Sequence, residues 1–242
     1  MTRTPADVDA VAHVFVDALE PRVTIASADG HHLQRVRRLA TGEQITAADG
    51  SGAWRVYEIA SIASGRLELD ACGETERVVA PAVRLALAIA LTKSGLDAVV
   101  PALTELGVAT ITPVRTERAV VRWDAAKTAH IVERLQAAAR EAAMQSRRAD
   151  IPTIGALTDF DAIAATPDLV VADRGGVPAW QLAPPASGRW TVLVGPEGGL
   201  SERELAGVAA QPRLFLGRNV LRATTAPVAA ASVLTQRIAQ IA

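Results

Sequence analysis

The feature that most constrains the fold of this 242-residue chain is a short stretch near its carboxyl end, WTVLVGPEGGLSERE (190–204). Its first part, Trp190 to Val194, is a compact apolar run, typical of a strand that is buried on both faces. Three glycines and a proline then interrupt the run, and a capping box formed by Ser201 and Glu204 predicts the start of a helix. This order places the glycine loop at the carboxyl edge of a sheet, where open α/β sheets bind ligands.

The loop by itself leaves open whether it binds a ligand or is an ordinary tight turn. It is not a phosphate-binding P-loop, because the lysine and the hydroxyl residue of that motif are missing. A second stretch, LGRNVLRATTAP (216–227), also follows a short apolar run and ends in a helix start. Thr224 or Thr225 can cap that helix, and Pro227 is tolerated in its first turn. The second stretch favours the ligand-binding interpretation of the first.

Composition excludes several classes of protein. No run reaches the ~18 apolar residues of a membrane span, and the amino terminus lacks the apolar core of a signal peptide. Cys72 is the only cysteine, which rules out an internal disulfide and a cysteine-based zinc site. We therefore expect a cytoplasmic protein without a metal. The net charge of −1 gives no overall sign of nucleic-acid binding, but all except two of the 25 basic residues are arginines, which suit phosphate.

The pattern along the chain predicts two domains. Short apolar runs within residues 11–70, separated by glycine turns, predict strands with one short helix at about residues 31–39, and this arrangement suggests a small barrel. Beyond a polar segment that reaches Pro81, strand and helix patterns alternate, which predicts a mainly parallel sheet with helices on both faces. We expect one helix from Gly95 to Leu106 and a long helix capped by Asp124. The expected domains are residues 1–72 and 78–242.

The motif GPEGGLSxxE followed by LGxxxLRxxTA resembles the SPOUT-class RNA methyltransferases, and within them the group that methylates N3 of a uridine in small-subunit ribosomal RNA. The stretches LTKSGLDAVVPALTELGV, TERAVV and EAAMQSRR with Pro152 are similar to further family segments. HHLQRVRRL and GEQITAADGSG resemble the family's PUA-like domain. Asp150, Arg218, Asn219 and Thr224 depart from the family pattern, which leaves the detail of RNA docking open.

The resemblance implies a fold, a cofactor and partners. The fold is an α/β SPOUT domain with a deep trefoil knot at the carboxyl end, preceded by a PUA-like RNA-binding β-barrel. The implied cofactor is S-adenosyl-L-methionine, and the implied substrate is uracil-1498 of 16S ribosomal RNA in the small subunit. Family members are homodimers. No membrane and no metal are expected to take part.

The resemblance also implies roles for individual residues. Arg222 is the candidate cation beside the charge that develops on uracil, and Glu197 is the candidate proton acceptor, although each could instead have a structural role. Arg35, Arg37, Arg38, Gln145 and Arg148 are the candidates for RNA binding, with a solvated helix face as the alternative for the first three. His31 and His32 are expected to be ordinary residues of the barrel. The cofactor-binding residues are expected to be Val194, Gly195, Pro196, Glu197, Gly199, Leu216, Gly217, Asn219, Val220, Leu221 and Thr225.

Two other functions remain open at this point. A related SPOUT enzyme could methylate a ribose 2′-hydroxyl of transfer or ribosomal RNA, although the PUA-like segment and the GPEGG form of the loop argue against it. Alternatively, the chain could be a non-catalytic RNA-binding factor for ribosome assembly that has kept the fold. The intact glycine loops and Arg222 argue against this second alternative.

Overall fold

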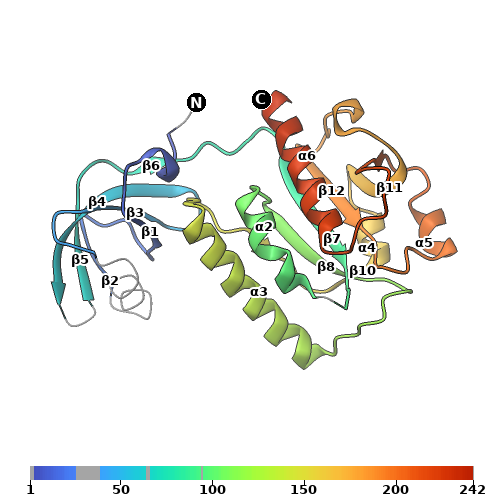
Figure 1. Cartoon of the computed structure of the whole chain (residues 1–242), viewed down its shortest axis with the longest axis horizontal. Helices are drawn as coiled ribbons and strands as arrows, with labels where there is room; N and C mark the ends of the chain where they lie inside the picture. Colours follow the sequence, from blue (N-terminus) through green and yellow to red (C-terminus); the bar gives the residue numbers. More distant parts are fainter. Residues whose placement is uncertain (1–2, 26–38, 64–65, 94, 242) are drawn as a thin grey trace. The chain divides into compact units, whose positions relative to one another are not determined.

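The computed structural model describes residues 3–25, 39–63, 66–93 and 95–241 (Figure 1). The chain forms two compact units: Met1–Ala80 together with Ala143–Ile151, and Pro81–Ala142 together with Pro152–Ala242. This division differs from the predicted domains 1–72 and 78–242 in two respects. The first boundary lies after Ala80, and the first unit includes a segment from the middle of the chain.

The described residues of the first unit form a six-stranded sheet. Its strand order is β1-β3-β4-β5-β2, with β6 paired to β4. β1 and β3 run parallel, and the remaining pairs are antiparallel. The elements of this unit are η1 (Pro5–Asp7), β1 (Ala12–Phe15), β2 (Arg22–Ile25), β3 (Gln44–Ala48), β4 (Ala53–Ala63), β5 (Arg66–Ala71) and β6 (Glu76–Arg77).

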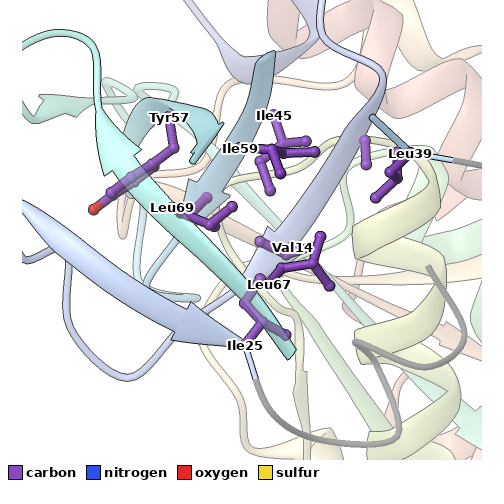
Figure 2. Close-up of a cluster of buried hydrophobic side chains, with 10 residues drawn as sticks. Val14, Ile25, Leu39, Ile45, Tyr57, Ile59, Leu67 and Leu69 are labelled. Atoms are coloured by element: carbon purple, nitrogen blue, oxygen red, sulfur yellow. The ribbon is translucent and has the colours of Figure 1, made fainter. Parts of the chain in front are cut away.

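Both faces of this sheet bury apolar side chains because residues alternate between the faces along a strand. On β3, Ile45 and Ala47 belong to the cluster shown in Figure 2. Ala48, from the other face, belongs to a second cluster with Trp54 of β4. The second cluster also contains Ala143 and Ala149. The mid-chain segment therefore completes the core of the first unit.

Hydrogen bonds also hold the mid-chain segment to the first unit. The Ile151 amide donates to the Gly50 carbonyl at 3.0 Å, and the Gly52 amide donates to the Ala149 carbonyl at 3.1 Å. The guanidinium of Arg147 donates to the carbonyl oxygens of Val8 and Ala10. These contacts join residues about a hundred positions or more apart in sequence, and sequence patterns gave no sign of them.

The second unit contains a seven-stranded sheet in which every pair is parallel. The strand order is β10-β8-β7-β12-β11-β13, with β9 paired to β8. This confirms the predicted parallel α/β sheet. The strands are β7 (Arg84–Ala90), β8 (Thr110–Arg115), β9 (Thr153–Ile154), β10 (Thr158–Asp159), β11 (Leu169–Val177), β12 (Arg189–Val194) and β13 (Arg213–Leu214).

Helices pack against the central strands of this sheet. Phe160 and Ile163 of α4 share a buried cluster with Ala88 and Leu193, which lie on one face of β7 and β12. α6 contacts the same two strands and also α2, and it lies across β7 and β12 in Figure 1. The helices are η2 (Leu96–Ala98), α2 (Val100–Glu105), α3 (Ala125–Gln145), α4 (Phe160–Ala164), η3 (Ala179–Gln181), α5 (Glu202–Gly207) and α6 (Thr225–Ile241).

Two predicted helices can be compared directly with the structure. The single helix expected from Gly95 to Leu106 is two elements, η2 and α2. Pro101 explains the break, because proline lacks an amide hydrogen and fits only the first turn of a helix. The predicted cap of α3 is confirmed: an Asp124 carboxylate oxygen accepts from the Lys127 amide at 2.8 Å. Among the described residues, no helix has the length and hydropathy needed to cross a bilayer.

Candidate functional site

The first glycine loop is a tight turn between β12 and α5. The Gly199 amide donates to the Pro196 carbonyl at 2.9 Å, and Gly199 has a φ of 69°. A side chain is strained in this left-handed conformation, so the turn requires glycine. Ser201 then caps α5, and its hydroxyl oxygen accepts from the Glu204 amide at 3.1 Å. The capping box predicted from the sequence is therefore present.

The second glycine loop connects β13 to α6. Gly217 has a φ of 140°, and a Cβ atom added there would meet no other atom within 4 Å. Further along the loop, the Arg222 carbonyl accepts hydrogen bonds from the amides of Thr225 and Ala226, each at 2.9 Å. The backbone of Arg222 therefore anchors the start of α6, which leaves its side chain available for another role.

A third segment belongs to the same site as these two loops: the turn Asp173-Arg174-Gly175-Gly176 within β11. The sequence patterns did not predict it. A bulge occurs here, since Ala172 and Val177 both pair with Leu214 of β13. At Gly176 an added Cβ would lie 2.5 Å from the Arg213 carbonyl oxygen, so only glycine fits. The adjacent glycines Gly175 and Gly176, two residues beyond the apolar run 169–172, are the signal that could have revealed this turn.

The three segments surround one cavity of about 800 Å³ at the carboxyl ends of β11, β12 and β13. Its volume lies within the range of small-molecule sites. Thr225, which was expected to bind the cofactor, does not line it. The other ten residues predicted to bind the cofactor all do, as does Arg222, and they are joined by Val171, Ala172, Asp173, Arg174, Gly175, Leu200, Leu205, Ala223 and Ala226.

Three charged side chains line this cavity while being exposed to solvent: Arg174, Glu197 and Arg222. Within the described part of the chain, none of the three makes a side-chain ion pair or hydrogen bond. Asp173, next to Arg174, is instead paired with Arg213 at 2.6 Å. The cavity therefore combines a backbone cradle with two cations and one carboxylate that can face a ligand.

The carboxylate of Glu204 fixes the first loop to a neighbouring turn. It is fully buried, and its two oxygens accept from the amides of Ser201 and Glu117, both at 2.8 Å. Arg118, in the same turn as Glu117, donates to the Gly198 carbonyl at 3.3 Å. The turn at 116–119 and the glycine loop consequently form one hydrogen-bonded assembly.

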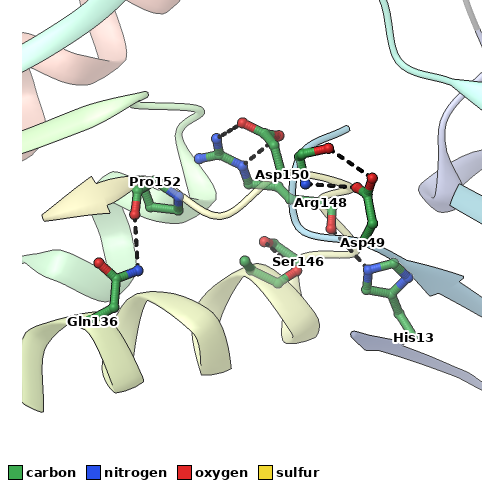
Figure 3. Close-up of polar contacts among 9 residues, drawn as sticks. His13, Asp49, Gln136, Ser146, Arg148, Asp150 and Pro152 are labelled. Carbon is green, nitrogen blue, oxygen red and sulfur yellow. Dashed lines mark hydrogen bonds and ion pairs between the residues drawn. The ribbon is translucent and has the colours of Figure 1, made fainter. Parts of the chain in front are cut away.

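The predicted RNA-binding residues are distributed over several places. Arg35, Arg37 and Arg38, like His31 and His32, lie outside the described residues. Gln145, the last residue of α3, is exposed. The Arg148 side chain is only 12% exposed and forms an ion pair with Asp150 at 2.7 Å (Figure 3). Asp150, one of the departures from the family pattern, thus neutralises a candidate RNA-binding cation.

A buried histidine lies beside this pair. His13 is 4% exposed, and its Nε2 lies 2.9 Å from the Arg148 carbonyl oxygen (Figure 3). Because a carbonyl only accepts, Nε2 carries the proton, and Nδ1 accepts from the Thr46 hydroxyl at 2.8 Å. Burial is the main cause that lowers the pKa of His13 to about 4. This histidine is therefore neutral and structural. Over the described ranges, no three His, Cys, Asp or Glu side chains gather as a metal site requires.

Comparison with known proteins supports this description of the fold. A model of the RNA methyltransferase domain matches residues 80–235, and a model of the RNA methyltransferase PUA domain matches residues 25–72. The first match covers both glycine loops and the turn in β11. The fold is thus that of the RNA methyltransferase class.

Two named relatives show which family within this class the chain belongs to. The chain is 31% identical to the ribosomal RNA small subunit methyltransferase E of Mycobacterium bovis, with 92% of each chain covered. It is 33% identical to the protein of the same name from a Synechocystis strain, with 88% of this chain and 72% of that protein covered. The chain belongs to the family of ribosomal RNA small subunit methyltransferases E.

Solved structures agree with this assignment. The ribosomal RNA small subunit methyltransferase E from Neisseria gonorrhoeae, bound to S-adenosyl methionine, superimposes with a TM-score of 0.80 at 25% identity, over 93% of this chain and 97% of that one. A putative methyltransferase from Legionella pneumophila, in complex with the same cofactor, gives a TM-score of 0.80 at 25% identity, over 95% and 98% of the two chains.

Proposed function

We propose that this protein transfers a methyl group from S-adenosyl-L-methionine to N3 of a specific uridine in 16S ribosomal RNA of the small subunit. The observation that carries the proposal is the cavity at the carboxyl ends of β11–β13, where both glycine loops and Arg222 come together. Membership of the methyltransferase E family and the two cofactor-bound structures that the chain resembles support it.

The residues present fit the proposed cofactor. The glycine loops expose backbone N–H and C=O groups, which can recognise an adenine and a ribose without long side chains. Any Cβ on Gly217 would project into space that no other described atom fills within 4 Å, as expected where a ligand approaches the main chain. We assign Gly195, Gly199, Leu216, Gly217 and Leu221 to the adenosine part of the ligand.

The bound cofactor supplies an electrophilic methyl group; this chain's residues have to present uracil to it and manage the charge. Removing the N3 proton leaves negative charge on O2 and O4, and a fixed cation beside it lowers the barrier. We assign that role to Arg222, which lines the cavity and whose carbonyl accepts two amides at the start of α6. Glu197, exposed at the same cavity, either accepts the proton or orients the loop.

We propose further features from the family relationship. The carboxyl-terminal segment forms a trefoil knot, and the sheet of the first unit closes as a PUA-like barrel. RNA phosphate is bound by Arg35, Arg37 and Arg38 of this barrel, and the target nucleotide is held by Gln145 and Arg148. The protein works as a homodimer in the cytoplasm, where ribosomal subunits are assembled. Trp180, which is 69% exposed on η3 beside α6, offers an apolar surface for a second copy.

Nucleoside analysis of ribosomal RNA tests the reaction. Small subunits from a strain that lacks this enzyme are incubated with the purified protein and S-adenosyl-L-methionine, and the RNA is digested and analysed by mass spectrometry. We expect one new 3-methyluridine. A ribose-methylated nucleoside would support the 2′-O-methyltransferase alternative instead, and no change would support the non-catalytic assembly factor.

Calorimetry with a loop variant tests the cofactor cavity. Gly199→Val places a side chain at a φ of 69° beside the cavity, so we expect binding of S-adenosyl-L-methionine to be lost. The control is Gly73→Val, because Gly73 also has open space around its Cβ position but has no positive φ. Equal affinity in the two variants and the parent would overturn the assignment of this loop.

A further inference from the structure

A second cavity lies at the same carboxyl edge of the sheet, where β8 and β10 end. It has a volume of about 390 Å³ and is lined by residues 115–117, 119 and 121–123, by Asp159 and the start of α4, and by Arg203 and Glu204 of α5. The proposed mechanism leaves it without a role. The cavity is nevertheless linked to the first glycine loop, because hydrogen bonds of Glu204 and Arg118 hold the 116–119 turn against that loop.

The buried lining of this cavity is mostly apolar; its polar groups are one hydroxyl group and the Glu204 carboxylate, whose two oxygens already accept backbone amides. Trp123 and Phe160 are 9% and 3% exposed and line it together with Ala119 and Val121. Thr116 is 6% exposed, and its Oγ1 is buried with no hydrogen-bond partner among the described residues. A buried hydroxyl without a partner carries a desolvation cost that a ligand could relieve.

The charges around the opening largely cancel. Arg203 pairs with Glu117 and with Asp161; these hydrogen bonds raise the pKa of its guanidinium. Arg115 pairs with Asp159. Such a rim selects neither an anion nor a cation, so the group that enters is neutral. Arg122 is exposed at the opening and makes no ion pair within the described ranges.

We propose that this second cavity binds an unpaired nucleobase of the RNA close to the target uridine, which rests on the proposed function. A nucleobase is flat, has apolar faces and carries hydrogen-bonding groups at its edge, as the aromatic lining and the Thr116 hydroxyl require. Proteins recognise single-stranded RNA in this way. Arg122 and the remaining N–H groups of Arg118 bind the phosphates on either side of the base.

Filling the cavity tests the proposal. Ala119→Trp occupies the space with an indole, whereas Val120→Trp adds the same group at the next residue, which is 73% exposed and does not line the cavity. Affinity for small subunits is measured with S-adenosylhomocysteine, so that no methyl transfer is needed. We expect Ala119→Trp to weaken RNA binding roughly tenfold and Val120→Trp to leave it unchanged, with cofactor affinity and melting temperature at the parent values.

A milder variant and a direct probe accompany this test. Thr116→Val keeps the shape and removes the hydroxyl, so we expect the KM for small subunits to rise about fivefold with kcat unchanged. Small-subunit RNA that contains 4-thiouridine near the target should crosslink to the peptide containing Trp123 in the parent and not in Ala119→Trp.

Parent-like RNA affinity in Ala119→Trp, or crosslinks that avoid residues 115–123 and Phe160, would overturn the nucleobase site. A change of oligomeric state in Ala119→Trp without loss of RNA affinity would also overturn it and assign the cavity to a second copy of the chain. Failure of the proposed function would look different, because the parent itself would then form no methylated nucleoside.

Discussion

At the scale of single residues, the proposed chemistry depends most on Arg222. Its carbonyl accepts hydrogen bonds from two amides at the start of α6. Arg222 also lines the cofactor cavity, and its side chain makes no ion pair or hydrogen bond within the described residues. Because hydrogen bonds fix the backbone of Arg222, its charged side chain loses little conformational freedom when it is positioned beside the substrate. This division of roles is the reason to test the side chain by itself.

Replacing Arg222 should affect the chemical step and not the fold. A cation that acts only on charge formed during the reaction changes the rate more than it changes ground-state binding. For Arg222→Ala we expect the single-turnover rate of methylation to fall roughly 10²- to 10³-fold, and for Arg222→Lys we expect a smaller loss, since lysine lacks the planar fork. Cofactor affinity should stay within about tenfold of the parent.

An unchanged single-turnover rate in Arg222→Ala would show that Arg222 is not catalytic. Arg218→Ala is the matched control, because Arg218 is an exposed arginine of the same loop that does not line the cavity. If Arg222→Ala instead unfolds or loses the cofactor, the side chain has the structural role and another group supplies the charge.

His13 makes the stability of the first unit dependent on pH. Burial lowers its pKa from 6.5 to about 4, against the hydrogen bond to Arg148 and with a smaller contribution from Arg147. Between these two values the unfolded chain binds a proton that the folded chain does not, so the free energy of unfolding falls as the pH falls from 6.5 to 4. The full effect is roughly 3 kcal/mol.

Urea unfolding at a series of pH values measures this dependence. His13→Gln should show a shallower decrease in the free energy of unfolding between pH 6.5 and 4 than the parent. The exposed His130 provides the control, and His130→Gln should follow the parent curve. Parallel curves for the parent and His13→Gln would contradict the assignment.

At the scale of elements, α5 is a helix of only six residues. Hydrogen bonds at its N-terminus hold two loops together. The Glu204 carboxylate is fully buried and accepts two backbone N–H groups, one from each loop. A carboxylate is suited to this place because both of its oxygens accept and neither donates. The helix therefore acts as a fixed junction between the cofactor loop and the turn that lines the second cavity.

Glu204→Gln should weaken this junction. One side of the amide is an NH₂ group, which would face a backbone N–H and leave it without an acceptor. We expect a loss of about 1–3 kcal/mol in the free energy of unfolding, together with weaker cofactor binding. Glu202→Gln in the same first turn, where the side chain is exposed, should change stability little. Equal stability of Glu204→Gln and Glu202→Gln in urea titrations would contradict this account.

At the scale of the whole molecule, the two compact units are not consecutive in sequence. The segment Ala143–Ile151 belongs to the first unit although the chain on either side of it belongs to the second. Its apolar residues, Ala143, Met144, Ala149 and Ile151, pack in the cluster that contains Phe15 and Trp54. A truncation that removes residues 1–80 therefore also removes the core into which these residues pack.

Truncation to residues 81–242 should retain cofactor binding, because the whole second sheet and its cavity remain. We expect it to aggregate more readily than the full chain, since residues 143–151 lose their apolar partners, and to methylate small subunits poorly. Co-expression with residues 1–80 should restore solubility. Light scattering and a methylation assay measure both effects. Full solubility and activity of the fragment alone would show that the first unit is dispensable.

Local sequence patterns determined the parts of this protein that depend on neighbouring residues. The glycine turn after β12, the Ser201–Glu204 capping box, the Asp124 cap and the alternating strands and helices follow from backbone preferences within a few positions. The residues predicted to bind the cofactor came from the family resemblance, and ten of the eleven line one cavity. Thr225, the first residue of α6, is the exception and does not line the cavity.

Only the tertiary structure decided what depends on distant residues. The turn at Asp173–Gly176 reaches the cavity because β11 bulges against β13, Asp150 neutralises Arg148, and residues 143–151 complete the core of a sheet formed far earlier in the chain. The second cavity likewise assembles from β8, α4 and α5. Such contacts arise from burying apolar surface and pairing polar groups across the fold, and no pattern within a few residues specifies which distant partner satisfies them.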